Sequence, residues 1–277
     1  MEEAMKRVFL AGAASLVLIG TASAADVGYP PPRPVAPVVP VVVPFSWTGC
    51  YLGGFVGGAW TNDVKVTDPY GNFGGVPFDS WGYSVKSSFI GGGTAGCNWQ
   101  PIGTAWVLGI EGEAGYMSLT GSALDPIAGP LGPNALFASA KIGNGYGMIT
   151  GRLGYAVDRV LFYAKGGVAF LDESVSVSHQ AFPNLGVPAV AVSASGNNAH
   201  WTVGGGIEWA FANNWSLKAE YMAIGLENNS PCSFIPGGAI IPAGSYCWNH
   251  SGLGAVSTFK VGLNYLFGGG VPLIARY

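Results

Sequence analysis

The sequence predicts an all-β fold, an eight-stranded antiparallel up-and-down transmembrane β-barrel with a polar filled interior. The chain of 277 residues is 49% hydrophobic but only 10% charged, whereas soluble domains are about 25% charged. Its 45 glycines and 19 prolines oppose long helices, and no apolar run reaches the roughly 18 residues of a membrane helix. Apolar residues instead alternate with small and charged ones, which is typical of strands with one face toward lipid.

The N-terminal residues 1–24 have the features of a signal peptide. A basic pair at positions 6 and 7 precedes the apolar run 8–19, and small residues at 22–24 suit signal peptidase. Cleavage is therefore expected between Ala24 and Ala25, whether translation starts at Met1 or at Met5. We expect export to the bacterial outer membrane, because transmembrane barrels of this kind are built there.

Residues 25–46 are predicted to form a proline-rich periplasmic linker. Seven prolines lie between Tyr29 and Pro44, which keeps this segment out of a sheet interior. In an extended polyproline conformation, at roughly 3.1 Å per residue, the segment reaches about 50 Å. That length favours contact with peptidoglycan, which we expect as one partner. The barrel follows at 47–267, and a C-terminal tail covers 268–277.

Eight alternating segments are expected to be the strands of the barrel. They lie at Gly49–Trp60, Lys86–Trp99, Trp106–Leu119, Gly145–Val157, Val160–Leu171, His200–Phe211, Trp215–Leu226 and Val256–Phe267. Short connections alternate with four long ones, at 61–85, 120–144, 172–199 and 227–255. Outer-membrane barrels have short periplasmic turns and long extracellular loops, so this asymmetry places both termini in the periplasm.

The ionisable residues of these strands fall on the face opposite to the large apolar ones. Glu208, for example, alternates with Ile207 and Trp209. A cation that faces lipid near the middle of the bilayer costs about 2 to 4 kcal/mol, so we expect the charges inside. The interior network is predicted to contain Glu111, Glu113, Arg152, Lys165, Glu208, Lys218, Glu220 and Lys260. Acids and bases would pair across a lumen too narrow for a wide pore.

A soluble eight-stranded barrel of the lipocalin type is the competing fold. It would be apolar inside and charged outside. Here the face without charges carries large residues, including Trp99, Trp201, Trp209 and Trp215. Several of them lie near strand ends, where an aromatic girdle meets the lipid headgroups. The lipid-facing barrel is therefore favoured.

The four cysteines allow two disulfides, since export makes such bonds permissible. Cys232 and Cys247 lie in the last long connection, and we expect them to bridge rather than to stay free thiols. Cys50 and Cys97 lie near the periplasmic ends of adjacent strands, on the same face. They bridge only if they are directly opposite each other, so bridged and free forms both stay open here.

The sequence offers no catalytic, metal or cofactor site. His179, His200 and His250 fall in or beside the long connections, and we expect solvated loop histidines rather than haem or metal ligands. The Gly91–Gly96 stretch matches the dinucleotide pattern, but Pro101 soon follows and no helix can open there. A net charge of −3 offers no electrostatic case for nucleic acid.

Several segments resemble one protein family. "FSWTGCYLGGFVGGAW", "FIGGGTAGCNWQ", "VLGIEGEAGY", "TGRLGYAVDRVLFYAKGGVAF", "WTVGGGIEWAFANNWSLKAEYM" and "FKVGLNYLF" are similar to the small outer-membrane β-barrel proteins of alphaproteobacteria, a porin-like surface-antigen family with the architecture of the OmpA membrane domain. The resemblance covers nearly all of 45–267. One departure is the tail 268–277, since such barrels usually stop at the aromatic residue that closes the last strand, here Phe267.

This resemblance implies a structural, non-enzymatic protein that supports envelope integrity and meets unknown extracellular partners through its loops. Outer-membrane lipid and lipopolysaccharide are the further partners expected. Some relatives are reported to bind haem or to act as weak pores, so a small porin for ions or solutes and a haem-binding surface protein are the alternatives. A lumen or loop enzyme is a third reading, and the family brings no catalytic residues with it.

Overall fold

A computed structural model of the chain describes residues 45–69, 79–126, 136–181, 183, 189–226, 228, 230–235, 243–252 and 254–267. The predicted signal peptide with its cleavage site at Ala24 and Ala25, the prolines of the linker and the tail 268–277 lie outside these residues and stay predictions. Among the described residues, no helix has the length and apolar character needed to cross a membrane.

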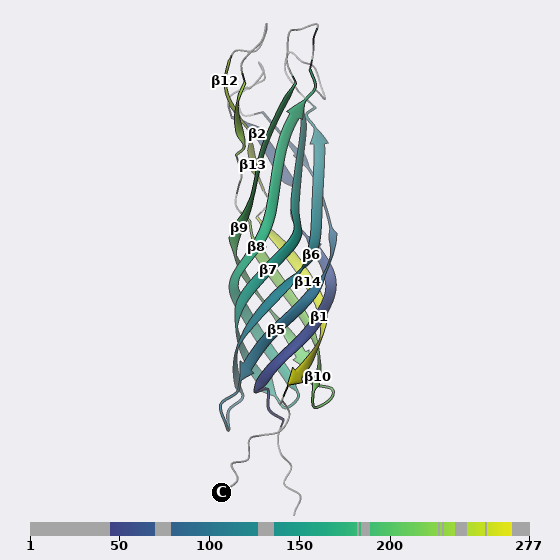
Figure 1. Cartoon of the computed structure of the whole chain (residues 1–277), viewed down its shortest axis with the longest axis vertical. Coiled ribbons are helices and arrows are strands. Elements are labelled where there is room, and N and C mark those ends of the chain that lie inside the picture. The colour runs from purple at the N-terminus through teal and green to yellow at the C-terminus, as the bar shows by residue number, and fades with distance from the viewer. Residues whose placement is uncertain are drawn as a thin grey trace, which may run out of the picture. The chain divides into compact units, whose positions relative to one another are not determined.

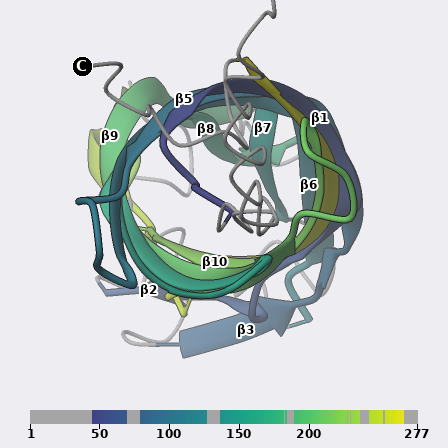
Figure 2. The same cartoon turned by 90° about the horizontal axis from the view of Figure 1, so that it is seen from below.

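Eight antiparallel strands form a closed ring, as predicted (Figure 1). In order around the ring they are β1 (Gly49–Trp60), β5 (Ser88–Trp99), β6 (Trp106–Leu124), β7 (Phe137–Val157), β8 (Val160–His179), β9 (Val190–Trp209), β10 (Trp215–Gly225) and β14 (Ala255–Phe267). Each strand pairs with the next one, and β14 pairs with β1 to close the ring. Since the ring follows chain order, the barrel is of the up-and-down type (Figure 2).

Side chains alternate between the lumen and the outer surface along the ring strands. In β14 the even-numbered residues from Val256 to Leu266 are buried, and the odd-numbered ones from Phe259 to Phe267 are exposed. The exposed set is apolar and aromatic, whereas the buried set includes Lys260 and Asn264. This reversal of the usual soluble pattern is the one expected of a barrel whose outer face meets lipid.

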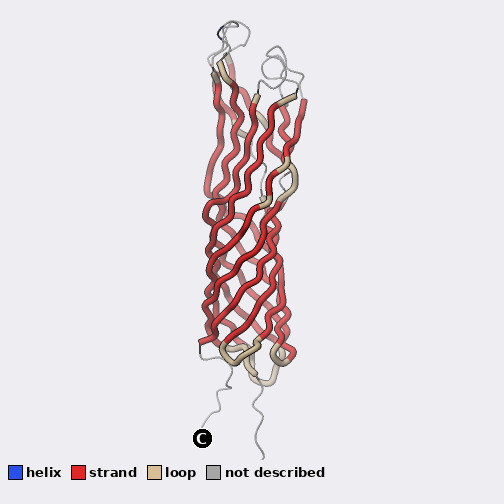
Figure 3. The backbone as a smooth tube through the Cα atoms, turned by 90° about the vertical axis from the view of Figure 1, so that its right-hand side faces the viewer, coloured by secondary structure: helices blue, strands red, loops and turns tan. Residues whose placement is uncertain are grey.

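Four neighbouring strands are longer than the sequence predicts. β6, β7, β8 and β9 have 19, 21, 20 and 20 residues, whereas β1, β10 and β14 have 12, 11 and 13. The predicted long connections at 120–144 and 172–199 are therefore largely strand, which continues past the rest of the ring (Figure 3). The sequence places these boundaries too close to the ring because many outward residues of the extended parts, such as Ser174 and Ser176, are small and polar rather than large and apolar.

The other two long connections contain short strands as well. β2 (Val64–Asp68), β3 (Asp79–Tyr83) and β13 (Asn249–Ser251) form a three-stranded sheet in the order β13-β2-β3. β4 (Val85–Lys86) pairs with β6, and β11 (Cys232–Ile235) forms a hairpin with β12 (Gly244–Cys247). We call the parts of β6–β9 beyond the ring, together with β2, β3 and β13, the surface extension. Because short periplasmic turns lie at the opposite end, this extension is on the extracellular side.

One continuous apolar cluster runs from the ring into the surface extension. From the extension it includes Val64, Val66, Trp81, Leu119, Ala138, Val175, Val177 and Val192, together with Trp248, which directly precedes β13. The three-stranded sheet and the long strands therefore bury side chains together, which explains why 61–85 and 227–255 are not simply loops.

Candidate functional site in the barrel lumen

The eight ionisable side chains of the predicted network all lie inside the ring. Each is at most 6% exposed: Glu111, Glu113, Arg152, Lys165, Glu208, Lys218, Glu220 and Lys260. They come from β6, β7, β8, β9, β10 and β14, at positions where the strand alternation turns the side chain inward. We call this set the lumen network.

The centre of the lumen network is a chain of alternating charges. The ammonium nitrogen of Lys165 lies 2.6 Å from Glu111 Oε1 and 2.8 Å from Glu220 Oε2. Lys260 continues the chain, at 3.0 Å from Glu220 Oε1 and 2.6 Å from Glu113 Oε1. Lys218 adds a second cation 3.2 Å from Glu111 Oε1. Each buried carboxylate of this group therefore has a buried cation beside it, which offsets part of the cost of burying the two charges.

A second group of charges surrounds Glu208. Arg152 forms an ion pair with Glu208, and its guanidinium lies 3.6 Å from the centre of the Tyr163 ring. Ser216 Oγ donates a hydrogen bond to Glu208, and Asn264 Nδ2 donates another at 2.9 Å. The carboxylate is thus held by an ionic partner and two neutral donors.

Three tyrosines belong to the same network, although the sequence analysis did not single them out. Tyr51 and Tyr146 donate their hydroxyl protons to Glu111 and Glu113, and Tyr163 donates to Glu220 at 3.0 Å. The missed signal was strand parity, because Tyr146 shares a face with Arg152 and Tyr163 shares one with Lys165.

Glycines make room for these rings. A Cβ atom at Gly96 would lie 2.5 Å from the Tyr51 hydroxyl oxygen, and one at Gly206 would lie 2.8 Å from that of Tyr163. Both distances are too short for a real contact, so glycine is needed opposite these two tyrosines. Part of the high glycine content of the sequence therefore serves the packing of the network.

The chain that precedes β1 packs inside the periplasmic end of the lumen. Trp47 is fully buried against the inward residues Val107, Leu161 and Ala210. Its backbone nitrogen donates to Gln100 Oε1 at 2.9 Å, which fixes the segment to a periplasmic turn. Seen from below, the purple segment before β1 runs from the wall of the ring into its opening (Figure 2). We call this arrangement the Trp47 plug.

The extracellular side of the lumen network is apolar as well. Large inward side chains fill the ring there, each no more than 3% exposed: Ile90, Met117, Met148, Leu171, Met222 and Ile224. The prediction of a polar filled interior therefore holds for the middle of the lumen, and apolar layers lie on both sides of it. Alternation alone did not reveal these layers, since inward apolar residues carry no charge to mark their face.

Three carboxylates of the lumen network lie close to one another and are already paired with cations. Glu111, Glu113 and Glu220 each offer an oxygen within 4.8 Å of the others, close enough to hold a metal ion. Their oxygens, however, already contact the ammonium groups of Lys165, Lys218 and Lys260. A cation would have to displace these lysines, which would leave positive charges buried without partners.

The three histidines are buried, so the expectation of solvated loop histidines is wrong. His179, His200 and His250 are 6%, 3% and 0% exposed. The extension packs around them, a tertiary arrangement that the local sequence does not indicate. His200 Nε2 lies 3.4 Å from Glu173 Oε1. Burial lowers the pKa of His250 to about 4, and the Trp248 backbone opposes this shift in part. Within the described residues, no group of three potential metal ligands includes a histidine.

Both cysteine pairs form disulfides. Cys50 of β1 lies directly opposite Cys97 of β5, the condition that the sequence analysis set for a bond between them. Cys232 and Cys247 are likewise opposite each other in the β11–β12 hairpin. The first bond therefore ties two ring strands near the periplasmic end, and the second closes a surface hairpin.

The family follows from this architecture and from sequence comparison. A profile described as outer membrane protein beta-barrel domain matches residues 46–267. The chain belongs to this family. It is 36% identical over 227 residues to the 31 kDa outer-membrane immunogenic proteins of Brucella melitensis biotype 1 and Brucella suis biovar 1, which covers 79% of this chain and 86% of each relative. The resemblance to porin-like surface antigens of alphaproteobacteria is thereby confirmed, and so is the outer-membrane location.

Comparison with solved structures finds two other outer-membrane proteins, both with TM-scores below 0.5. The outer membrane protein OprG from Pseudomonas aeruginosa has a TM-score of 0.49 at 9% identity, with 80% of this chain and 99% of that one covered. The outer membrane protease OmpT from Escherichia coli has a TM-score of 0.47 at 10% identity, over 80% of this chain and 98% of that one.

Proposed function

We propose that the protein is a closed structural barrel of the outer membrane that presents a folded β-module at the cell surface, and that solutes do not cross it. One observation supports this most strongly: the lumen is filled at three successive levels, by the Trp47 plug, the lumen network and the apolar side chains above it. A small porin would need a continuous water-filled path, and these buried layers of side chains favour a closed lumen instead.

The lumen network favours a structural role over catalysis. All of its charges are withdrawn from water and are neutralised by one another. A general acid or base must reach a substrate, and these groups lie between two apolar layers. We therefore propose that the protein is not an enzyme. The network instead specifies which face of each strand points inward, since the reverse orientation would put ions into lipid.

The surface extension favours a role in contacts outside the cell. The Brucella relatives are named immunogenic outer-membrane proteins. In this chain, β6–β9 and the β13-β2-β3 sheet form a packed unit beyond the ring. We propose that this unit, rather than flexible loops, is what extracellular partners and antibodies meet. Protease treatment of intact cells should cut only within this unit, while cutting elsewhere in the barrel would contradict the proposed orientation.

The envelope partners are proposed on the same basis. The Trp47 plug holds the start of the barrel at the periplasmic mouth, so the proline-rich linker before it would begin in the periplasm, within reach of peptidoglycan. Deletion of 25–44 should leave the barrel folded and reduce its retention with isolated cell wall. Unchanged retention would remove peptidoglycan from the list of partners. Lipid and lipopolysaccharide would surround the apolar band between the aromatic ends.

A swelling assay tests the closed barrel. Liposomes that contain the refolded chain should swell in permeating sugars no faster than liposomes without protein. A deletion of 45–48 keeps the ring and removes the Trp47 plug, and we expect it to stay closed as well, because the lumen network and the apolar layer remain. Swelling by the unaltered chain would refute the proposal and favour the small porin.

A further inference from the structure

The wall of the surface extension has a built-in break between β7 and β8. Ile142 pairs with Glu173 and Tyr146 pairs with Leu171. Between these pairs β7 has residues 143, 144 and 145, whereas β8 has only Asp172, so the strand pairing opens there. Gly143 has a φ of 90°, and a Cβ atom on it would lie 2.4 Å from the Met117 carbonyl oxygen. Only glycine fits at position 143, so this bulge depends on Gly143.

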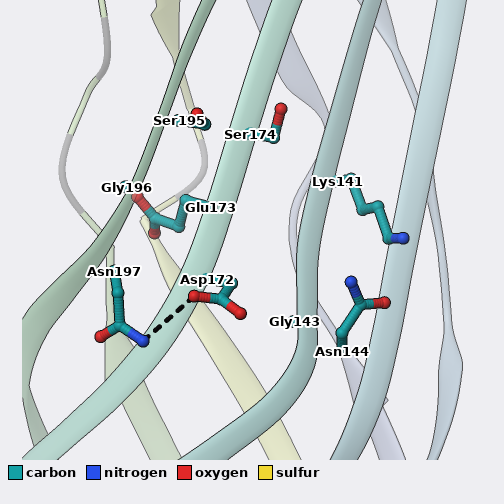
Figure 4. Close-up of a pocket in the computed structure, with 9 residues that line it drawn as sticks. All are labelled: Lys141, Gly143, Asn144, Asp172, Glu173, Ser174, Ser195, Gly196 and Asn197. Carbon is teal, nitrogen blue, oxygen red and sulfur yellow. Dashed lines mark hydrogen bonds between the residues drawn. The ribbon is translucent and has the colours of Figure 1, made fainter.

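A cavity of about 280 Å³, lined mostly by residues with polar side chains, lies at this break. Its walls are formed by three neighbouring strands: Lys141, Gly143 and Asn144 of β7, Asp172, Glu173 and Ser174 of β8, and Ser195, Gly196 and Asn197 of β9. Figure 4 shows these side chains, with the hydrogen bond of 3.0 Å from Asn197 Nδ2 to Asp172 Oδ1. Lys141, Ser174 and Ser195 lie side by side across the three strands.

The cavity lies where the outer lipid leaflet ends. Phe170 is an exposed aromatic residue on the outer face of β8, and Asp172 is the next residue on that face. On β9 the exposed Trp201 is followed upward by Ala199 and then Asn197. Aromatic residues of such barrels mark the boundary between the acyl chains and the headgroups. The cavity is therefore at the height of the headgroups.

The chemistry of the cavity suits a phosphorylated sugar. Lys141 takes part in none of the ion pairs formed among the described residues, so its ammonium group is available for a phosphate. Asn144, Asn197 and the two serines offer neutral donors and acceptors for hydroxyl groups. Asp172 and Glu173 place carboxylates in the same cavity, and Glu173 Oε1 also lies 3.4 Å from His200. Carboxylates disfavour a bare phosphate and accept hydrogen bonds from sugar hydroxyls.

We propose that this cavity binds the phosphorylated sugar headgroup of the glycolipid in the outer leaflet, with Lys141 contacting the phosphate. The proposal deepens the lipid contact suggested above and depends on the outer-membrane location. It does not depend on the closed lumen, so a barrel that conducts ions would leave it standing.

Equilibrium titration of the refolded chain in detergent tests the site. The probes are diphosphoryl lipid A, its enzymatically dephosphorylated form and inorganic phosphate, all with a chelator present so that no divalent cation forms a bridge. We expect Lys141→Gln to weaken binding of diphosphoryl lipid A about tenfold, the loss typical of one charged contact. Lys141→Arg should restore most of it, and dephosphorylated lipid A should bind the unaltered chain and Lys141→Gln alike.

The matched control is Lys86→Gln. Lys86 pairs with Thr120, which pairs with Lys141 on its other side, so both lysines lie in one row across the wall. Lys86 does not line the cavity. We expect Lys86→Gln to stay within about twofold of the unaltered chain, since one rim charge contributes little. If both variants lost the same affinity for diphosphoryl lipid A, the loss would come from the overall charge of the surface, and the proposed site would be wrong. If millimolar inorganic phosphate displaced lipid A, the cavity would recognise phosphate alone, and the proposal of a sugar headgroup as the ligand would be wrong.

Discussion

Lys260 of β14 reaches across the barrel to Glu113 of β6, with 2.6 Å between the ammonium nitrogen and Glu113 Oε1. The two strands are not neighbours, because β1 and β5 lie between them in the ring. The same ammonium group contacts Glu220 of β10 at 3.0 Å. One side chain therefore links three strands through the lumen.

Replacement of Lys260 by methionine should strongly destabilise the barrel. The change leaves Glu113 and Glu220 buried with less positive charge, and breaking a buried ion pair on one side costs about 3 to 5 kcal/mol. Urea unfolding in detergent micelles measures this loss in the free energy of unfolding. Lys86→Met, at an exposed lysine, is the control. The double variant Lys260→Met, Glu113→Gln should recover part of the loss. A Lys260→Met protein as stable as the control would contradict the role of the network.

Trp47→Ala should destabilise the periplasmic end of the barrel by about 3 to 5 kcal/mol, as large-to-small changes at buried aromatic residues do. Trp47 is fully buried, whereas Trp106 is 54% exposed on the outer face. Trp106→Ala therefore serves as the control for tryptophan removal as such and should cost less. The two free energies of unfolding come from the same micelle assay, and the account fails if their order is reversed.

The surface extension should weaken in mild acid. Burial lowers the pKa of His250 from 6.5 to about 4, so the unfolded segment binds a proton at a higher pH than the folded one. The stability due to neutral His250 is complete above about pH 6.5 and is lost as the pH falls toward about 4, by up to about 3 kcal/mol. Amide hydrogen exchange in β2 and β13 across this range measures the effect. His250→Phe should flatten the pH dependence, and an unchanged slope would exclude His250 as its source.

The two disulfides should affect different parts of the molecule. Cys50–Cys97 spans 47 residues of the ring, and its loss costs about 4 kcal/mol in the chain-entropy model. Cys232–Cys247 spans 15 residues of a surface hairpin, so its removal should expose that hairpin to protease and leave unfolding of the ring unchanged. Two double variants, in which either Cys50 and Cys97 or Cys232 and Cys247 are replaced by serine, separate these effects. They are compared by unfolding and by limited proteolysis. Equal effects on the ring would contradict this division.

The ring was predictable because charge marks one face of each strand. Glu208 between Ile207 and Trp209 identifies the inward side, and the same reasoning applies to Arg152 and Lys165. Where a strand leaves the membrane, that signal ends: Ser174 and Ser176 on the outer face of β8 look like loop residues. The sequence therefore predicts loops where the structure has the extended parts of β6–β9.

Long-range packing also escaped prediction. Trp47 follows a proline-rich segment, and its contact with Leu161 joins parts of the chain far apart in sequence. His250 pairs with Val66 across a sheet that only the folded extension creates. Neither position carries a local pattern that indicates burial.

Single-channel recording in planar bilayers tests the closed lumen most directly. In concentrated potassium chloride at moderate voltages, the refolded chain should leave the current at the level of the bare membrane. Steady current steps from the unaltered chain would contradict the account. If the size of these steps changed when Arg152 or Glu208 is replaced by serine, the water-filled path would run through the lumen network.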